Sequence, residues 1–175
     1  MADVIKELIS EEKVKERIRE LGAEISKAYE GKKLHIICIL KGSIFFTCEL
    51  ARHITVPVTL DFITVSSYGD GRESTGKVRI VHDLDERIEG KDVLVIEDIV
   101  DTGRTLSYLL KMLQERNPAS LTLCTLLDKP MRRTHEVKVD YVGFAVPDEF
   151  IVGWGLDYAQ KYRNLPYIGI LGDDE

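Results

Sequence analysis

The stretch DVLVIEDIVDTGRT, residues Asp92–Thr105, is the most informative part of the sequence. Its apolar first half, Asp92–Glu97, predicts a buried strand, and the segment Thr105–Gln114 that follows predicts a helix. The connecting residues Asp101–Thr105 combine hydroxyl side chains with a glycine, at the place where α/β sheets bind their ligands. A phosphate there would gain backbone amide donors and the positive end of the helix dipole. The stretch therefore predicts a strand, a phosphate-binding turn and a helix.

Two acidic residues, Glu97 and Asp98, lie just before this turn. Their negative charge does not suit contact with the phosphate, but carboxylates at a strand end suit sugar hydroxyls or a magnesium ion. A simpler interpretation is a capped helix with acidic residues near its start, and Asp-Thr-Gly alone occurs by chance in many proteins. The apolar strand, the acidic pair and Asp-Thr-Gly-x-Thr together form a far more restrictive pattern.

The order of strand, loop and helix recurs along the chain. Leu34–Leu40 is continuously apolar, which is typical of a strand buried on both faces of a parallel sheet. This alternation predicts an α/β fold with a doubly wound, mostly parallel central sheet flanked by helices, in a single domain over residues 1–175. The predicted helices cover residues 11–29, 43–53 and 105–114, and the predicted strands cover 34–40, 56–65, 78–81, 92–97, 121–127, 139–146 and 167–171.

The overall charge limits the classes of partner. The 175 residues include 24 Lys and Arg and 30 Asp and Glu, a net charge of −6, which argues against broad binding of nucleic acid or anionic lipid. A local phosphate site is compatible with this charge. No basic segment followed by an apolar run opens the chain, and its apolar runs are far shorter than the ~20 residues of a membrane span. We therefore expect a cytoplasmic protein without a nucleic acid or membrane partner.

The three cysteines, Cys38, Cys48 and Cys124, are far apart, and each has apolar neighbours. They are predicted to be buried structural thiols rather than disulfides, metal ligands or a nucleophile. The polar, glycine-rich segment Ser66–Lys77 predicts a mobile loop that serves as a functional lid. Within it, Gly71–Lys77 matches part of a P-loop, but valine follows where Ser or Thr would bind magnesium, so we interpret this match as coincidence.

The pattern of Asp92–Thr105 resembles the phosphoribosyl diphosphate signature of the type I phosphoribosyltransferases, and the resemblance extends over nearly the whole chain. It implies the fold of that family, in which terminal segments form a small hood. It also implies that the acidic pair Glu97 and Asp98 holds the ribose hydroxyls and that the turn holds the 5′-phosphate. The turn residues with this implied role are Thr102, Gly103, Arg104 and Thr105.

Four further segments resemble the hypoxanthine and hypoxanthine-guanine branch of that family. They are the turn 40–42, which in the family often contains a cis peptide bond, the loop start 67–69, the strand end 127–130 and the segment 146–158. The implied contacts are Lys41, Gly42 and Arg163 for pyrophosphate, Ser67 and Tyr68 for a flexible loop, and Lys129, Phe150, Ile151 and Asp157 for the purine. By residue type alone, Phe150 is more often part of a core, and Lys129 is more often a surface charge. For the basic segment 131–135, the resemblance implies an arginine contact with the pyrophosphate region or a neighbouring subunit, and plain solvated charge is an equally open interpretation.

The resemblance implies a purine salvage reaction that transfers the 5-phosphoribosyl group from phosphoribosyl diphosphate to hypoxanthine, and also to guanine. The products would be inosine or guanosine monophosphate and pyrophosphate. Asp101 would accept the purine N7 proton, and Mg²⁺ bound by Glu97, Asp98 and Asp157 would stabilise the leaving group. The family also implies a homodimer or homotetramer.

Two alternatives stay open at this point. A regulatory protein on the same fold would bind nucleic acid, which needs an added domain or a basic face. An orotate or uracil enzyme would share the phosphate turn but would not need Lys129 or the segment 150–157.

Overall fold

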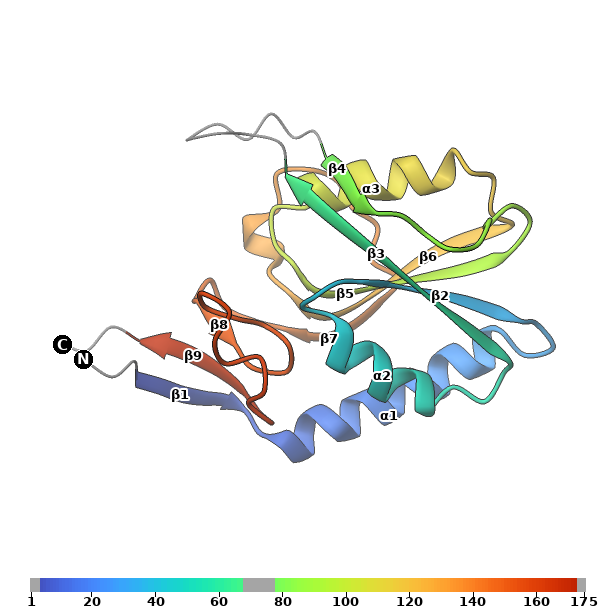
Figure 1. The fold of residues 1–175 in the computed structure, drawn as a ribbon. Helices are drawn as coiled ribbons and strands as arrows, with labels where there is room; N and C mark the ends of the chain where they lie inside the picture. The colour runs from blue at the N-terminus through green and yellow to red at the C-terminus, as the bar shows by residue number, and fades with distance from the viewer. Residues whose placement is uncertain (1–3, 68–77, 173–175) are drawn as a thin grey trace.

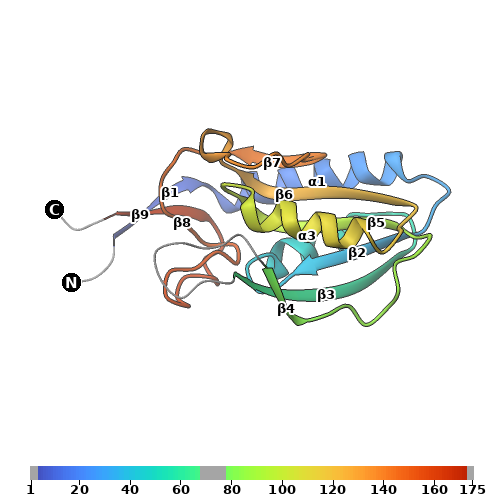
Figure 2. The same ribbon diagram turned by 90° about the horizontal axis from the view of Figure 1, so that it is seen from above.

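The computed structural model of the chain describes residues 4–67 and 78–172. A six-stranded sheet with the strand order β4-β3-β2-β5-β6-β7 lies at its centre (Figures 1 and 2). The strands β2, β3, β5, β6 and β7 are parallel, and the edge strand β4 is antiparallel to β3. The bounds of these strands are Leu34–Ile39 for β2, Val58–Ser67 for β3, Val78–His82 for β4, Asp92–Val100 for β5, Ser120–Asp128 for β6 and Tyr141–Ala145 for β7.

Helices cover both faces of this sheet. Helices α1 (Glu11–Ala28) and α2 (Ile44–Arg52) lie on one face and α3 (Arg104–Gln114) lies on the other (Figure 1). Successive residues of β2 enter the two cores, because Ile36 packs with α1 and α2 whereas Ile37 packs with α3. The predicted doubly wound α/β fold is confirmed.

Strand β5 is longer than the sequence predicted. It continues past Glu97 to Val100, since its backbone ladder with β6 extends to the pair Val100 and Asp128. The acidic pair therefore belongs to the end of the strand rather than to the loop. Polar side chains did not end the strand, because the ladder is made by backbone groups.

The two ends of the described chain form a second, three-stranded antiparallel sheet in the order β1-β9-β8. These strands are β1 (Val4–Ile9), β8 (Ile151–Val152) and β9 (Ile168–Gly172). This sheet is the hood that the family resemblance implied, and it lies beside the carboxyl end of the central sheet (Figure 1). Sequence reasoning missed β1, which is mostly exposed, and β8, which is only 2 residues long.

Two further predictions need correction. Cys38 and Cys124 are buried thiols as expected, but Cys48 is exposed because α2 buries its Phe46, Thr47 and Leu50 side instead. The predicted loop Ser66–Lys77 starts too early, since residues 66 and 67 pair with β4 as part of β3. Tyr68 and the P-loop-like segment 71–77 lie outside the described residues. No helix among the described residues is both long enough and apolar enough to span a membrane.

Candidate active site

The carboxyl ends of the central strands meet the hood around a cavity of about 490 Å³. Three separate segments contribute to it: the end of β5 and the following turn, the turn after β6, and residues 148–157. Its walls bring together all four predicted purine-binding residues with the predicted base. The lining residues are Asp98, Ile99, Asp101, Lys129, Arg132, Asp148, Glu149, Phe150, Ile151, Leu156 and Asp157.

A smaller cavity of about 140 Å³ adjoins it and contains the predicted phosphate turn. Ile99 and Asp101 line both cavities, so the two spaces are neighbours. The smaller one is lined by Glu97, Ile99, Val100, Asp101, Thr102, Gly103, Arg104, Thr105 and Leu106. The four residues predicted to hold the 5′-phosphate are thus on one continuous turn next to the predicted base.

Gly103 gives this turn its shape. Its φ is 81°, a left-handed conformation that glycine adopts without the steric cost of a Cβ. A Cβ at this position would also lie 2.8 Å from the carbonyl oxygen of His135. Gly103 directly precedes α3, so the amides of the turn lie at the positive end of that helix.

The catalytic candidate Asp101 is held by two arginines. Its Oδ1 accepts a hydrogen bond from Nε of Arg132 at 2.6 Å, and its carbonyl oxygen accepts one from Nη1 of Arg133 at 2.7 Å. Arg133 also forms an ion pair with Asp128, at the end of β6. The hydrogen bond to Asp101 raises the pKa of the Arg132 guanidinium. Sequence reasoning left open whether the arginines of segment 131–135 contact the pyrophosphate region or a neighbouring subunit or are solvated charges, and it did not predict their contact with Asp101. Their position directly after a strand end was the available signal.

Lys129 is a largely covered contact residue rather than an ordinary surface charge. Its side chain is only 11% exposed, and its Nζ donates to the carbonyl oxygen of Glu149 at 2.6 Å. Its backbone amide donates to the carbonyl oxygen of Val100 at 2.9 Å, which fixes it beside the end of β5. The ammonium group therefore lies between the β5 turn and the hood.

Phe150 lies at the surface of the cavity, not in the core. It is 52% exposed, and its ring meets that of Tyr158 edge to face, with centroids 5.5 Å apart. Ile151, directly after it, is 5% exposed and pairs with Ile170 of β9. The expectation from residue type alone was wrong for Phe150, because the hood holds its backbone while its ring faces the cavity.

The predicted pyrophosphate residues meet near Asp157. Nη2 of Arg163 lies 3.1 Å from Oδ1 of Asp157, and Nη1 of Arg163 donates to the carbonyl oxygen of Gly155 at 2.6 Å. Nε of Arg163 is buried without a hydrogen-bond partner. Nζ of Lys41 lies 3.4 Å from Oε1 of Gln160 in the same region.

The turn at Gly42 comes very close to Asp98. The Leu40–Lys41 peptide bond is cis, as the resemblance implied. A Cβ at Gly42 would collide with the carboxylate of Asp98. Only glycine therefore lets this turn approach the acidic pair so closely.

Glu97 and Asp98 are two neighbouring acids in a poorly solvated place. Oε1 of Glu97 accepts the backbone N–H of Asp98 at 2.9 Å. Burial, and then the negative charge of Asp98, raise the pKa of Glu97 well above its usual value. A cation or a proton near this pair would relieve the repulsion between them.

Comparison with known proteins agrees with this geometry. The phosphoribosyl transferase domain model matches residues 5–159. A hypoxanthine-guanine phosphoribosyltransferase from Bacillus subtilis is 50% identical over 169 residues, which cover 97% of this chain and 94% of that protein. The chain belongs to the hypoxanthine phosphoribosyltransferase family.

Further members of this family are equally similar. The hypoxanthine phosphoribosyltransferase of Salmonella typhimurium is 50% identical over 171 residues, covering 97% of this chain and 96% of that protein. The crystal structure of a hypoxanthine phosphoribosyltransferase from Staphylococcus aureus matches with a TM-score of 0.93 and 50% identity, over 95% of this chain and 91% of that one. The predicted fold and family are therefore confirmed.

Some relatives are much longer proteins. A bifunctional protein named TilS/HprT from Listeria monocytogenes is 53% identical over 169 residues, which cover 97% of this chain but only 26% of that protein. The chain thus spans about a quarter of the length of these bifunctional relatives.

The carboxylates of Glu97, Asp98 and Asp157 suit a magnesium ion that is also bound by substrate oxygens, not one held by the protein alone. Among residues 4–67 and 78–172, no group of three or more acidic, histidine or cysteine side chains could hold a metal ion by itself. Asp98 and Asp157 line the larger cavity, whereas Glu97 lines the smaller one. Magnesium commonly binds one or two carboxylates together with substrate phosphates, and these hard oxygen donors suit that mode.

Proposed function

We propose that this chain transfers the 5-phosphoribosyl group from phosphoribosyl diphosphate to hypoxanthine, and also to guanine. The products are inosine or guanosine monophosphate and pyrophosphate. The observation that carries the proposal is the single cavity in which Asp101, Lys129 and Phe150 face one another beside the phosphate turn. Relatives that are about half identical in sequence carry the same activity in their names, which supports it.

The purine occupies the larger cavity. The exposed ring of Phe150 offers a flat surface for stacking, and the ammonium of Lys129 is a donor for the purine O6. The backbone groups of Ile151 form hydrogen bonds with the edge of the purine ring. A 6-oxo group accepts a hydrogen bond whereas a 6-amino group donates, so Lys129 selects hypoxanthine and guanine over adenine.

Phosphoribosyl diphosphate binds across the two cavities. Its 5′-phosphate lies on the turn Thr102–Thr105, and its ribose hydroxyls meet Glu97 and Asp98. Lys41 and Arg163 receive the pyrophosphate, and the unpartnered buried Nε of Arg163 is a donor available to it.

Two charges develop in the transition state. Cleavage of the C1–O bond leaves positive charge on the ribose, which Glu97 and Asp98 balance, and negative charge on the pyrophosphate. As N9 attacks, Asp101 accepts the proton from N7. Arg132 orients the Asp101 carboxylate beforehand and can keep its ion pair with Asp148 when Asp101 becomes protonated.

Asp98 and Asp157 are the residues that would hold magnesium, together with oxygens of the substrate, and Glu97 would support them from the strand end. When bound, the metal neutralises charge on the departing pyrophosphate. The lid role predicted for Ser67 and Tyr68 would exclude water from this site. We also propose one domain over residues 1–175, a cytoplasmic location, and assembly as a homodimer or homotetramer.

Chromatographic detection of inosine monophosphate tests the proposal. The protein is incubated with phosphoribosyl diphosphate and hypoxanthine, with magnesium or with excess chelator. Formation of inosine monophosphate and pyrophosphate in equal amounts, and only with magnesium, is expected. Absence of inosine monophosphate would contradict the activity, and equal rates in chelator would contradict the metal requirement.

A further inference from the structure

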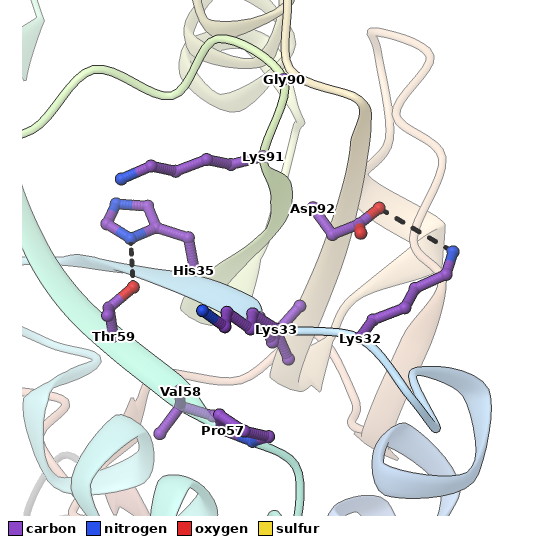
Figure 3. A pocket seen from close by; sticks show the side chains of 10 residues that line it. Lys32, Lys33, His35, Pro57, Val58, Thr59, Gly90, Lys91 and Asp92 are labelled. Atoms are coloured by element: carbon purple, nitrogen blue, oxygen red, sulfur yellow. Dashed lines mark hydrogen bonds and ion pairs between the residues drawn. The ribbon is translucent and has the colours of Figure 1, made fainter.

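A second large cavity lies at the opposite ends of the same central strands. It measures about 510 Å³ and opens where β2, β3 and β5 begin (Figure 3). The catalytic cavity lies where these strands end. Strand β2 alone has 6 residues, so about 20 Å separates the two sites. The cavity is lined by Lys32, Lys33, Leu34, His35, Pro57, Val58, Thr59, Gly90, Lys91 and Asp92.

The lining is basic although the protein is acidic. Three lysines, at positions 32, 33 and 91, face a single carboxylate in the lining, that of Asp92. Nζ of Lys32 lies 4.0 Å from Asp92, and Lys91 pairs with Glu86, outside the lining. The ammonium of Lys33 has no ion-pair partner among the described residues. An anion that binds at Lys33 therefore breaks no existing ion pair, whereas one that also binds at Lys91 shares that ammonium with Glu86.

A buried histidine forms part of this wall. His35 is 2% exposed, and its ring lies between Lys91 and Thr59 (Figure 3). Its Nδ1 lies 2.7 Å from Oγ1 of Thr59, but its buried Nε2 has no hydrogen-bond partner. The nearest carboxylate oxygen, in Asp61, is 3.6 Å away, which is too long for a hydrogen bond.

The surroundings of His35 lower the pKa of its imidazole. Burial lowers it most and the positive charge of Lys91 lowers it further, while the carboxylates of Asp61 and Glu86 oppose this shift. A buried imidazole with a hydrogen-bond partner at only one of its two nitrogens is uncommon. Nε2 of His35 is thus a polar atom of this wall without a hydrogen-bond partner, next to Lys91.

The other walls are apolar. Leu34, Pro57 and Val58 contribute hydrocarbon surface, and the lysine side chains add their methylene groups. An inorganic anion would leave this surface uncovered, whereas a phosphorylated molecule with a flat organic body would cover it. The volume is within the range of about 300–1,000 Å³ that is typical of small-molecule sites.

We propose that this cavity is a second ligand site, which binds a nucleotide with its phosphates at Lys33 and Lys91 and its base against Pro57 and Val58. The catalytic residues take no part in it, because they lie at the other ends of the strands. The site is therefore independent of the proposed transfer reaction.

Proton NMR of the histidine rings tests this proposal with ATP as the probe. The chain has 4 histidines, and the His35 signal is assigned by its loss in His35→Gln. As ATP is added, the chemical shift of the His35 signal is expected to change and then to reach a plateau when the site is saturated. An unchanged His35 signal at millimolar ATP would overturn the proposal.

Three variants locate the binding. Lys33→Gln is expected to weaken the ATP affinity measured at His35 about tenfold, the usual effect of losing one charge-assisted hydrogen bond. Lys138→Gln changes a lysine that is 89% exposed and is the matched control. Lys41→Gln changes a residue with a proposed role in pyrophosphate binding, beyond the carboxyl end of β2, and is expected to leave this affinity unchanged. Equal losses in Lys33→Gln and Lys138→Gln, or a loss in Lys41→Gln, would contradict the assignment.

A comparison of ligands separates nucleotides from inorganic anions. ATP is expected to bind more tightly than tripolyphosphate, because only ATP covers the apolar walls. Equal affinities would contradict recognition of the organic body and would leave an inorganic polyanion as the occupant.

Discussion

The proposed active site has two walls, one in each of its neighbouring cavities, and they are built in different ways. The phosphate wall is one continuous turn, Asp101–Thr105, whose shape depends on Gly103 and on the start of α3. The purine wall joins Lys129, Phe150 and Asp157, which follow different strands and meet only because the hood folds against the central sheet. Local backbone geometry thus determines the shape of the phosphate wall, whereas tertiary contacts bring the residues of the purine wall together. Substitutions in the two walls should therefore affect different substrates.

The largest effect is expected at Asp101, where the two walls meet. Asp101→Asn should slow the chemical step by about 10²–10⁴-fold, the usual contribution of a positioned acid–base group. The fold and substrate binding should persist, because Arg132 retains Asp148 and Arg133 retains Asp128. Single-turnover kinetics measure this step directly. An unchanged single-turnover rate would remove Asp101 from the role of base.

Gly103→Ala tests the phosphate wall. A left-handed alanine costs about 1–2 kcal/mol, and its Cβ would approach the carbonyl oxygen of His135 to 2.8 Å. At about 2–4 °C for each kcal/mol in a chain of this size, the Tm should fall by several degrees. Calorimetry should show a larger loss of affinity for phosphoribosyl diphosphate than for hypoxanthine. A folded variant with both affinities unchanged would show that the turn does not depend on glycine.

Lys129→Ala tests the purine wall and should give the opposite selectivity. The loss of a charge-assisted hydrogen bond should weaken hypoxanthine binding by about 10- to 100-fold, and affinity for phosphoribosyl diphosphate should change less. Lys138→Ala, at a highly exposed lysine, serves as the control. Equal losses for both substrates would contradict the assignment of Lys129 to the purine.

The smallest effect is expected from Glu97→Gln in the absence of substrate and metal. The pKa of Glu97 is raised in the folded protein, so this carboxyl favours folding below its unfolded pKa, and that contribution is lost as pH rises through the folded pKa. The Tm of the variant minus the Tm of the parent should therefore increase as the pH rises from 5 to 8. Thermal unfolding across this range measures the difference. A difference that stays constant with pH would contradict the burial of an uncompensated acid.

Sequence reasoning located the phosphate wall because its determinants are local. An apolar strand, two acids and a glycine turn are adjacent in the chain, and only the length of β5 was underestimated. The purine wall could not be derived in this way, since residue type alone favoured a buried Phe150 and a solvated Lys129. Only the family resemblance indicated their roles.

The contacts of Arg132 and Arg133 with Asp101 depend on how the chain turns after β6. Their position after a strand end indicates that they lie near the site, but it does not identify Asp101 as their partner. The hood strand β1 was missed for a similar reason. Its exposed, partly charged residues become a strand only because β9 supplies a backbone partner.

Pyrophosphate release from phosphoribosyl diphosphate tests the central claim most directly, with hypoxanthine, guanine, xanthine, adenine and uracil supplied in parallel. We expect release with hypoxanthine and guanine, and none with adenine or uracil, because the proposal assigns recognition of a 6-oxopurine to Lys129 and the segment 150–157, which line one cavity. Release with uracil alone, or with none of the five bases, would contradict the account.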